Sequence, residues 1–438
     1  MSSARGIDIE RFVNGEMELH FRCITLTQKN SQEPILFVGP GRVYLDNGEL
    51  RFCLYHTNVS DESARHMRMA LSGRAGEVVR EDSYFLFEGT DAWGRIWTSD
   101  SVDLHGGSYH SQLSIVEGST FSLKSTITSE SMGREMLHQV YLPNIDFPFP
   151  HYEIPSGIDF ESGGLIFSLR KHEDICDVTV TGSELRDTLQ DAIHSMLNVL
   201  AGIHFQVALV EKIGKGNSTF TIFSRNNDAS NFKMPPPIGM PYQLPSRFFE
   251  RVFNVFLPFF EEEGNVFYGN WNKLNRAWQN GIESTALSVS VCIEGILKTY
   301  FNALGEDLEF KELCQKAKPA LKGLGIDERV KSILQSSLGN AGHFKPKTAL
   351  HKLTESGLIS PGLATKWNVL RSQTAHAVSL GQSLEDQQRL VNLVYANFKL
   401  FYQIFFAIID YDGDRIDYEE QGHPSGPRRD LESLGAKK

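Results

Sequence analysis

Trp367-Asn-Val-Leu-Arg371-Ser-Gln-Thr-Ala-His376-Ala-Val-Ser-Leu-Gly381 is the stretch around which the rest of the chain is organised. A helix is expected to lead into it from Pro361, because proline suits a first helical turn. Arg371 is a permanent cation whose planar fork of donors matches phosphate. His376 can give or take a proton near neutral pH. A phosphate clamp beside a proton shuttle is what phosphodiester cleavage needs, so both residues are predicted to be catalytic.

The spacing of the two residues adds a constraint. Five helical positions rotate by ~500°, so the side chains of Arg371 and His376 would point ~140° apart and lie ~7.5 Å apart along the axis. Either the helix ends near His376, or a second copy of the motif completes the site. The alternative is an arginine on a helix surface and a histidine near a helix C-terminus, where cations are favoured.

The sequence on either side of this motif is locally basic. Between residues 341 and 382 a single acidic residue, Glu355, accompanies five permanent cations, namely Lys345, Lys347, Lys352, Lys366 and Arg371. In a chain of net charge -11 this is the local footprint expected of a site that holds a phosphate backbone. The four lysines are therefore predicted to bind a phosphate backbone. The alternative is a chance run of charge on a solvated helix face.

The second half of the chain reads as helix. A proline-rich segment, residues 234–245, is predicted to be a linker. Residues 246–411 are predicted to form a helical domain, in which Gly281 is expected to interrupt a long helical stretch over residues 273–304. The last helix of the domain opens at Ser383 with Asp386 three positions later as a capping box. Residues 412–438 are polar and charged and are expected to be a disordered tail.

The first half reads as strands. Residues 42–55 alternate apolar and polar side chains around Asn47-Gly48, which predicts a β-hairpin. Residues 1–150 are predicted to form a sandwich-like domain or a curled antiparallel sheet. Residues 151–233 are predicted to form an α/β region packed on it. The fold class expected is α+β multidomain, with a β-rich N-terminal region followed by an all-α helical bundle.

Composition limits the class of protein. Of 438 residues, 41% are hydrophobic, which is enough for full cores. The net charge of -11 argues against a surface that coats nucleic acid broadly. The five cysteines are scattered without a C-x-x-C pair, which favours a reducing compartment over disulfides or a zinc site. The sequence predicts a soluble cytoplasmic protein with no metal, no cofactor and no membrane partner.

The helical half resembles a HEPN domain. The resemblance rests on the late helical region, on the Arg-x4-His spacing at the end of its penultimate helix, and on one long closing helix. Residues 288–298 match the early core helix of that family, where Glu294 would face the motif. The β-rich half joined to such a domain resembles the ApeA-like abortive-infection proteins of bacteria. The likeness covers residues 246–411, and only the general layout of 1–245.

The resemblance implies a metal-independent endoribonuclease that acts as a homodimer and defends against phage by cleaving RNA, with tRNA as the candidate substrate. Arg371 would stabilise the scissile phosphate, and His376 would act as general acid or base at a ribose 2′-hydroxyl. The backbone bound by Lys345, Lys347, Lys352 and Lys366 would be that of RNA. Ser372 would support them, although active members often carry Asn, Asp or His there. The alternative is a non-catalytic HEPN module that binds RNA or a nucleotide. In either case the β-rich half would recruit a partner, such as a phage-derived trigger.

Overall fold

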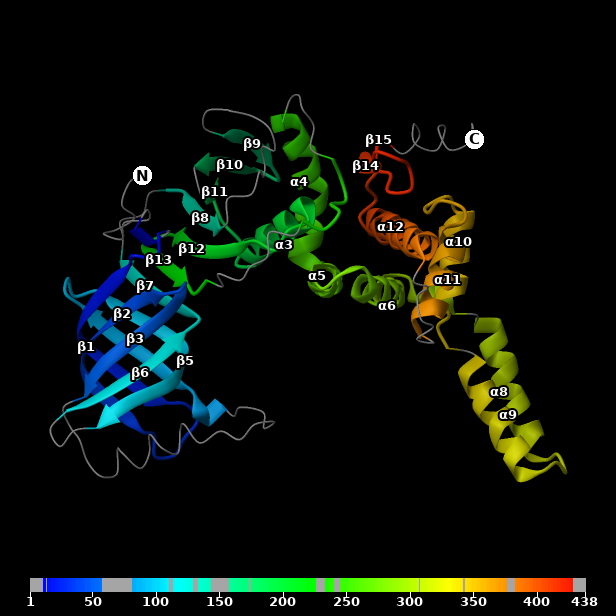
Figure 1. The fold of residues 1–438 in the computed structure, drawn as a ribbon, viewed down its shortest axis with the longest axis horizontal. Coiled ribbons are helices and arrows are strands. Elements are labelled where there is room, and N and C mark those ends of the chain that lie inside the picture. Colours follow the sequence, from blue (N-terminus) through cyan, green and yellow to red (C-terminus); the bar gives the residue numbers. More distant parts are fainter. Residues whose placement is uncertain are drawn as a thin grey trace. The chain divides into compact units, whose positions relative to one another are not determined.

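The structure is a computed structural model that describes residues 11–12, 14–56, 81–109, 113–128, 133–142, 157–172, 175–225, 233–239, 245–306, 308–341, 343–375 and 383–427. The chain divides into two compact units. The β-rich unit comprises Met1–Gln190, Phe205–Ala229 and Tyr242–Arg251, and the helical unit comprises Asp191–His204, Ser230–Pro241 and Val252–Lys438. An α+β multidomain protein with strands first and helices second is therefore confirmed at this level (Figure 1).

The β-rich unit is built on one antiparallel sheet, whose described strands follow the order β4-β1-β2-β3-β6-β5-β7-β13-β12-β8-β11-β10-β9. The first six strands are β1 (Glu18–Gln28), β2 (Leu36–Asp46), β3 (Glu49–His56), β4 (Phe85–Asp91), β5 (Ile96–Tyr109) and β6 (Ser114–Thr120). The others are β7 (Ser122–Thr128), β8 (Glu135–Leu142), β9 (Ile158–Ser162), β10 (Leu165–His172), β11 (Ile175–Gly182), β12 (Gln206–Ile213) and β13 (Asn217–Phe223).

Strands β1 to β6 close into a barrel, because β4 pairs with β5 as well as with β1 (Figure 1). The interior is filled by apolar side chains such as Phe52, Phe87 and Val102. The hairpin predicted at Asn47-Gly48 is confirmed, since Asp46 pairs with Glu49 and both turn residues have positive φ, 50° and 86°. Of the two alternatives predicted for these strands, the curled antiparallel sheet is the one found, because one sheet curls back on itself where a sandwich needs a second sheet.

A buried carboxylate fixes the turn that closes the barrel. Asp91 is 0% exposed, and its Oδ1 accepts the backbone N–H groups of Trp93 and Arg95, each at 2.9 Å. Its Oδ2 accepts Nε of Arg95 at 2.7 Å and Nε1 of Trp97 at 3.1 Å. Burial alone would raise the pKa of Asp91, but these hydrogen bonds and the Arg95 charge outweigh it and lower the pKa.

Beyond the barrel the same sheet continues as an open surface. Trp97 and Thr98 of β5 pair with Ser125 and Lys124 of β7, and the order then runs through β13, β12, β8, β11, β10 and β9. The strands expected to form a separate α/β layer over residues 151–233 are thus part of the barrel's own sheet. The single described helix of that stretch, α3 (Leu189–Ala201), belongs from Asp191 onward to the helical unit.

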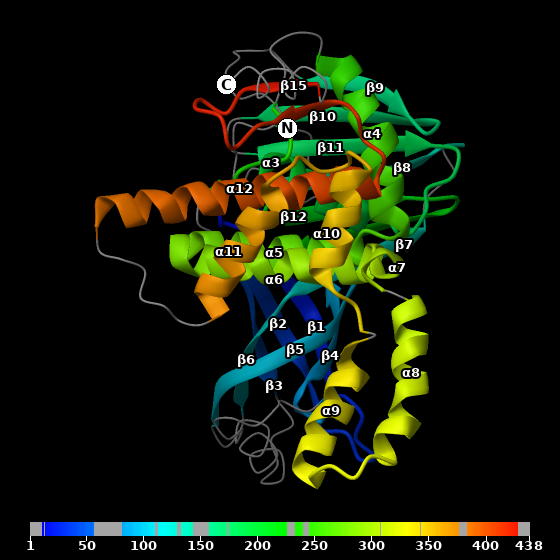
Figure 2. The same cartoon turned by 90° about the vertical axis from the view of Figure 1, so that its right-hand side faces the viewer.

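The helices of the second half of the chain are shown most openly in Figure 2 and belong to the helical unit, except that the start of the first of them, up to Arg251, belongs to the β-rich unit. They are α4 (Pro245–Glu262), α5 (Asn265–Gln279), α6 (Ile282–Tyr300), α7 (Asn302–Gly305), α8 (Leu308–Lys322), α9 (Glu328–Ala341), α10 (Pro346–Glu355), α11 (Leu363–Ala375) and α12 (Leu384–Ile408). The expected break at Gly281 is confirmed by its φ of 104°. Ser383 is confirmed as the N-cap, because its hydroxyl accepts the backbone N–H of Asp386 at 3.1 Å, while the Asp386 carboxylate accepts from that hydroxyl at 2.7 Å.

The proline-rich segment is not a free linker where the structure describes it. Residues 233–239 run through the helical unit with Met234 and Ile238 buried. The hydroxyls of Tyr402 and Tyr418 donate to the carbonyls of Pro235 and Pro236, and Met234 N donates to Gly202 O at 2.8 Å. A Cβ at Gly202 would lie 2.1 Å from Met234 O, so only glycine permits this approach.

The expectation of a disordered tail is wrong for residues 412–427. Strands β14 (Asp414–Ile416) and β15 (Ser425–Pro427) pair, and Arg415 and Asp417 are buried. Asp417 accepts from Lys399 of α12 at 2.8 Å. A partly buried cation on the last helix therefore holds a segment that polarity alone would leave free. Residues 428–438 lie outside the described part.

Helix α12 contributes many buried apolar side chains to the helical core. By length and composition it could span a bilayer, but 56% of its most apolar window is buried within the structure. The ring of Phe405 stacks on Phe267 of α5 at 4.1 Å between centroids, and Phe401 lies 5.3 Å from the same ring. Packing in a protein core therefore accounts for the apolar character of this helix.

The Asp91 turn gives a direct test of barrel closure. Asp91→Ala removes the acceptor of a partly buried guanidinium and a buried indole N–H, which should cost ~3–5 kcal/mol of unfolding free energy. Asp103→Ala is the control, on an exposed position of β5, and should cost less than ~0.5 kcal/mol. Because the folded pKa of Asp91 is lowered, its contribution is complete above about pH 3.9 and is lost as the pH falls through the folded pKa. Urea unfolding of both variants would measure it, and equal losses would contradict this role.

Candidate functional site

Arg371 lies on α11 and makes a charged contact with α6. Its Nε donates to Oε2 of Glu294 at 2.9 Å, and its Nη2 lies 2.9 Å from the same oxygen. Both side chains are partly exposed, 48% for Arg371 and 36% for Glu294. Within the described chain the guanidinium has no other hydrogen-bond partner, so Nη1 remains available to a ligand.

A buried tryptophan one turn earlier explains this placement. Trp367 is 1% exposed, and its Nε1 donates to the backbone carbonyl of Ser290 at 3.2 Å. Ser290 lies one turn before Glu294 on α6, as Trp367 lies one turn before Arg371 on α11. The guanidinium carbon of Arg371 sits 5.6 Å from the Trp367 ring centroid, which favours a cation. The buried contact of Trp367 with Ser290 thus sets the position of the exposed contact between Arg371 and Glu294.

The other two motif residues have different outcomes. His376 lies outside the described residues, which end on α11 at Ala375. Ser372 is exposed on α11 beside Arg371. The structure therefore brings Arg371 and Glu294 together, while the distance from Arg371 to His376 stays undefined. The catalytic roles of Arg371 and His376 remain predictions.

The four predicted RNA-binding lysines do not form one set. Lys347 and Lys352 are exposed on α10 without a salt bridge in the part of the chain that the structure describes. Lys345 precedes that helix, and its ammonium lies 5.4 Å from the ring of Phe310. Lys366 pairs with Glu419, and five helical positions turn it ~140° away from Arg371. Lys347 and Lys352 are thus the best placed to meet a polyanion.

One cation on the helix that holds Glu294 was missed in the sequence. Lys298 is exposed on α6 four positions after Glu294, so the two lie on the same helix face. Within the described residues Lys298 forms no salt bridge. The sequence signal for Lys298 was its spacing of four from Glu294 on a predicted helix. Lys298 lies 73 positions before Arg371, so only the packing of α6 on α11 relates the two residues.

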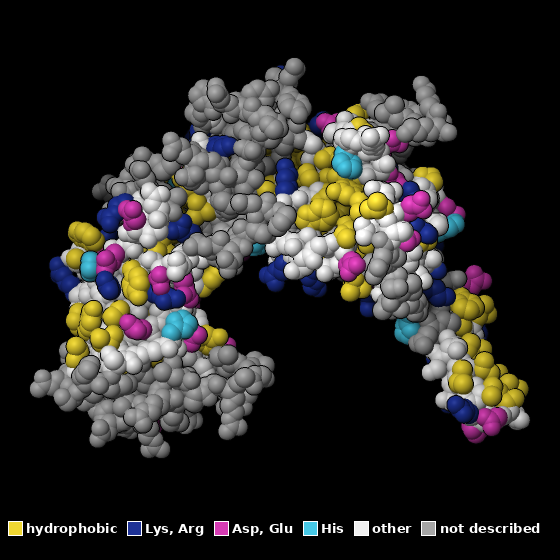
Figure 3. All heavy atoms as spheres, in the orientation of Figure 1, with side chains coloured by type: hydrophobic (Ala, Val, Ile, Leu, Met, Phe, Trp, Pro, Cys, Tyr) yellow, Lys and Arg dark blue, Asp and Glu magenta, His cyan; other side chains and the backbone are white. Residues whose placement is uncertain are grey.

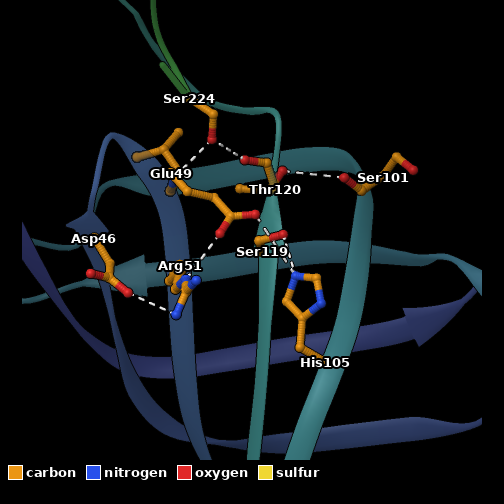
Figure 4. Close-up of polar contacts among 9 residues, drawn as sticks. Asp46, Glu49, Arg51, Ser101, His105, Ser119, Thr120 and Ser224 are labelled. Carbon is orange, nitrogen blue, oxygen red and sulfur yellow. Dashed lines mark hydrogen bonds and ion pairs between the residues drawn. The ribbon is translucent and has the colours of Figure 1, made fainter. Parts of the chain in front are cut away.

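A second polar cluster, on the barrel, does not have catalytic geometry (Figure 4). Nε2 of His105 is 2.6 Å from Oγ of Ser119 and 3.9 Å from Oε1 of Glu49. In a serine–histidine–acid triad the acid would bind the other ring nitrogen. Burial would raise the pKa of Glu49, but hydrogen bonds from Arg51 and Ser119 lower it. The cluster therefore ties neighbouring strands together.

The donors at Arg371 suit an anion better than a metal ion. Among the described residues no group of three or more His, Cys, Asp or Glu side chains could hold a metal. An arginine held at one edge by a carboxylate, with donors left on its other edge, can bind two oxygens of a phosphate. No protein-family model, no curated protein and no solved structure matches this chain.

The anchoring argument predicts separable effects on stability. Trp367→Ala should cost ~3–5 kcal/mol, because it empties a buried site. Arg371→Ala and Glu294→Ala should each cost less than ~1 kcal/mol, as exposed ion pairs do. Urea unfolding of the three variants would test this. A loss at Arg371 as large as that at Trp367 would make the arginine a structural residue.

Proposed function

We propose that the helical unit is a HEPN-type, metal-independent endoribonuclease, acting in the cytoplasm in defence against phage by abortive infection. The observation that carries the proposal is the position of Arg371. It lies partly exposed on Glu294, anchored by a buried tryptophan, and the chain reaches His376 five residues later. RNA, with tRNA as the candidate, is the proposed substrate.

The proposed reaction uses the ribose 2′-hydroxyl. His376 takes the proton of that hydroxyl, and its oxygen attacks the adjacent phosphorus. The bond from phosphorus to the 5′-oxygen breaks, the 5′-oxygen receives a proton, and a 2′,3′-cyclic phosphate remains. Arg371 donates from its free edge to the phosphate oxygens as negative charge builds up on them. Glu294 holds the guanidinium plane in place during this step, and no metal ion is required.

A homodimer through the helical unit is part of the proposal. The spacing of Arg371 and His376 on one helix favours a site to which a second copy contributes. The hairpin of α8 and α9 carries exposed apolar side chains, visible in Figure 3, including Phe310, Leu313, Val330, Ile333 and Leu334. Surface of this kind marks sites of association. Light scattering that gives the mass of one chain, with activity retained, would contradict the dimer.

A non-catalytic HEPN module that binds RNA or a nucleotide is the second candidate. The Glu294 carboxylate favours it, because it already neutralises the charge of Arg371. Binding by the remaining N–H groups needs no proton transfer, so it would not depend on His376. The two candidates therefore differ in what the histidine does.

Substitutions at the motif should separate these functions. His376→Ala should reduce RNA cleavage by ~10²–10⁴ while leaving RNA affinity nearly unchanged, because the histidine moves a proton. Arg371→Lys should also lose RNA cleavage, because lysine lacks the planar guanidinium that binds two phosphate oxygens at once. Cleavage in EDTA, with sequencing of the new ends, would show cyclic phosphates.

The control for this experiment is Thr365→Ala, an exposed position of the same helix, compared by thermal melts with the other two variants. Wild-type cleavage rates in a folded His376→Ala protein would end the ribonuclease proposal. Binding without any cleavage by the wild type would favour the second candidate.

Lysines of α10 should contribute to affinity without chemistry. Replacing Lys347 and Lys352 by glutamine should weaken RNA binding and lower its salt slope by about one to two units. Lys316→Gln with Lys322→Gln, an exposed lysine pair on α8, is the matched control and should leave the slope unchanged. Equal slopes in both double variants would show that α10 does not touch the RNA.

A further inference from the structure

The β-rich unit contains a pocket of about 440 Å³ on its open sheet. Its wall is formed by neighbouring strands β7, β13, β12 and β8, whose place is visible in Figure 1, and residues 185–190 bound it on one side. Its size is that of sites that hold small organic molecules. The apolar lining includes Leu137, Leu185 and Val210.

Some of the charged side chains that line the pocket already have a polar partner in the protein, and others do not. The cations are Lys124, Arg186 and Lys212, and the acids are Glu135 and Asp187. Oε2 of Glu135 already accepts the backbone N–H of Leu185 at 2.6 Å. Neither Lys124 nor Lys212 forms a salt bridge or side-chain hydrogen bond within the described chain. Lys212 is half-buried as a residue and Lys124 is exposed, and both line the pocket, so an anion bound there would supply a counter-charge to both.

Strand register places these lysines on either side of a row of hydroxyls. Lys124 pairs with Thr221 of β13, and Lys212 pairs with Thr219 of the same strand. The two threonines are two positions apart and share a sheet face, as directly paired residues do. The lysines are therefore two strand spacings apart across the sheet, roughly 10 Å. An anion bound by Lys124, by Lys212 or by both would lie next to the hydroxyl groups of Thr219 and Thr221.

We propose that this pocket binds a small organic phosphate of mononucleotide size. Its phosphate group would neutralise Lys124 and Lys212, its sugar hydroxyls would bond to Thr219 and Thr221, and its body would lie on Leu137 and Val210. A phosphate monoester carries close to two negative charges near neutral pH, which matches two unpaired ammonium groups. The site lies wholly within the β-rich unit and does not depend on ribonuclease activity in the other.

Calorimetric titration of the full chain would test this site. The probes are AMP, GMP, CMP, UMP and ribose 5-phosphate, with adenosine and inorganic phosphate as partial ligands. At least one organic phosphate should bind saturably with one site per chain, and adenosine and inorganic phosphate should each bind at least about tenfold more weakly. Lys212→Gln should weaken the binding about tenfold or more, and Lys124→Gln in addition should abolish it.

Lys29→Gln is the matched control, because Lys29 is also a half-buried lysine of the same unit and does not line the pocket. It should leave binding unchanged. The proposal is overturned if none of the organic phosphates binds at millimolar concentration, or if binding is equal in Lys212→Gln and Lys29→Gln. Inorganic phosphate that binds as tightly as the best organic phosphate would also overturn it, since the site would then hold an adventitious ion only.

Discussion

The buried carboxylate of Asp91 is the interaction on which the β-rich unit depends. A charge removed from water is tolerated only when its oxygens are fully hydrogen-bonded, and Asp91 meets this with four donors from three residues. One of them is the indole of Trp97, whose ring also packs edge-on against Phe220 of β13. Trp97 pairs with β7, so this one turn both closes the barrel and starts the open sheet. The lysine pocket lies on the strands that begin there.

The two candidate sites use charge in opposite ways. At α11 the cation is paired, and Glu294 orients the Arg371 guanidinium so that one edge faces outward. On the open sheet Lys124 and Lys212 form no salt bridge within the described chain, and the backbone of β7 and β12 holds them in place. The first arrangement fixes the orientation of the cation but neutralises part of its charge. The second leaves the charge of both lysines available to an incoming anion.

Local chemistry made part of this structure predictable. Three features depend only on residues a few positions apart, and the sequence predicted each of them. They are the hairpin at Asn47-Gly48, the helix break at Gly281 and the helix cap at Ser383. The contact of Arg371 with Glu294 was approached only through a family resemblance, since the two are 77 positions apart. Barrel closure could not be predicted from any one strand's pattern, because it depends on the pairing of β1 with β4 and of β3 with β6, whose paired residues are up to 70 positions apart. The buried tail was missed because the partner of Asp417 is Lys399 on another element.

The path of the chain through residues 233–239 limits how the protein can be taken apart. The chain enters the helical unit at α3, leaves it for β12 and β13, and returns with carbonyls held by Tyr402 and Tyr418. A fragment that starts at residue 246 would lack both earlier passages, and would leave those tyrosine hydroxyls without their acceptors. The two units are therefore not independent domains formed by separate, contiguous segments of the chain. Recombination that moved one of them would have to move the other, so the β-rich and helical units are expected to be inherited together.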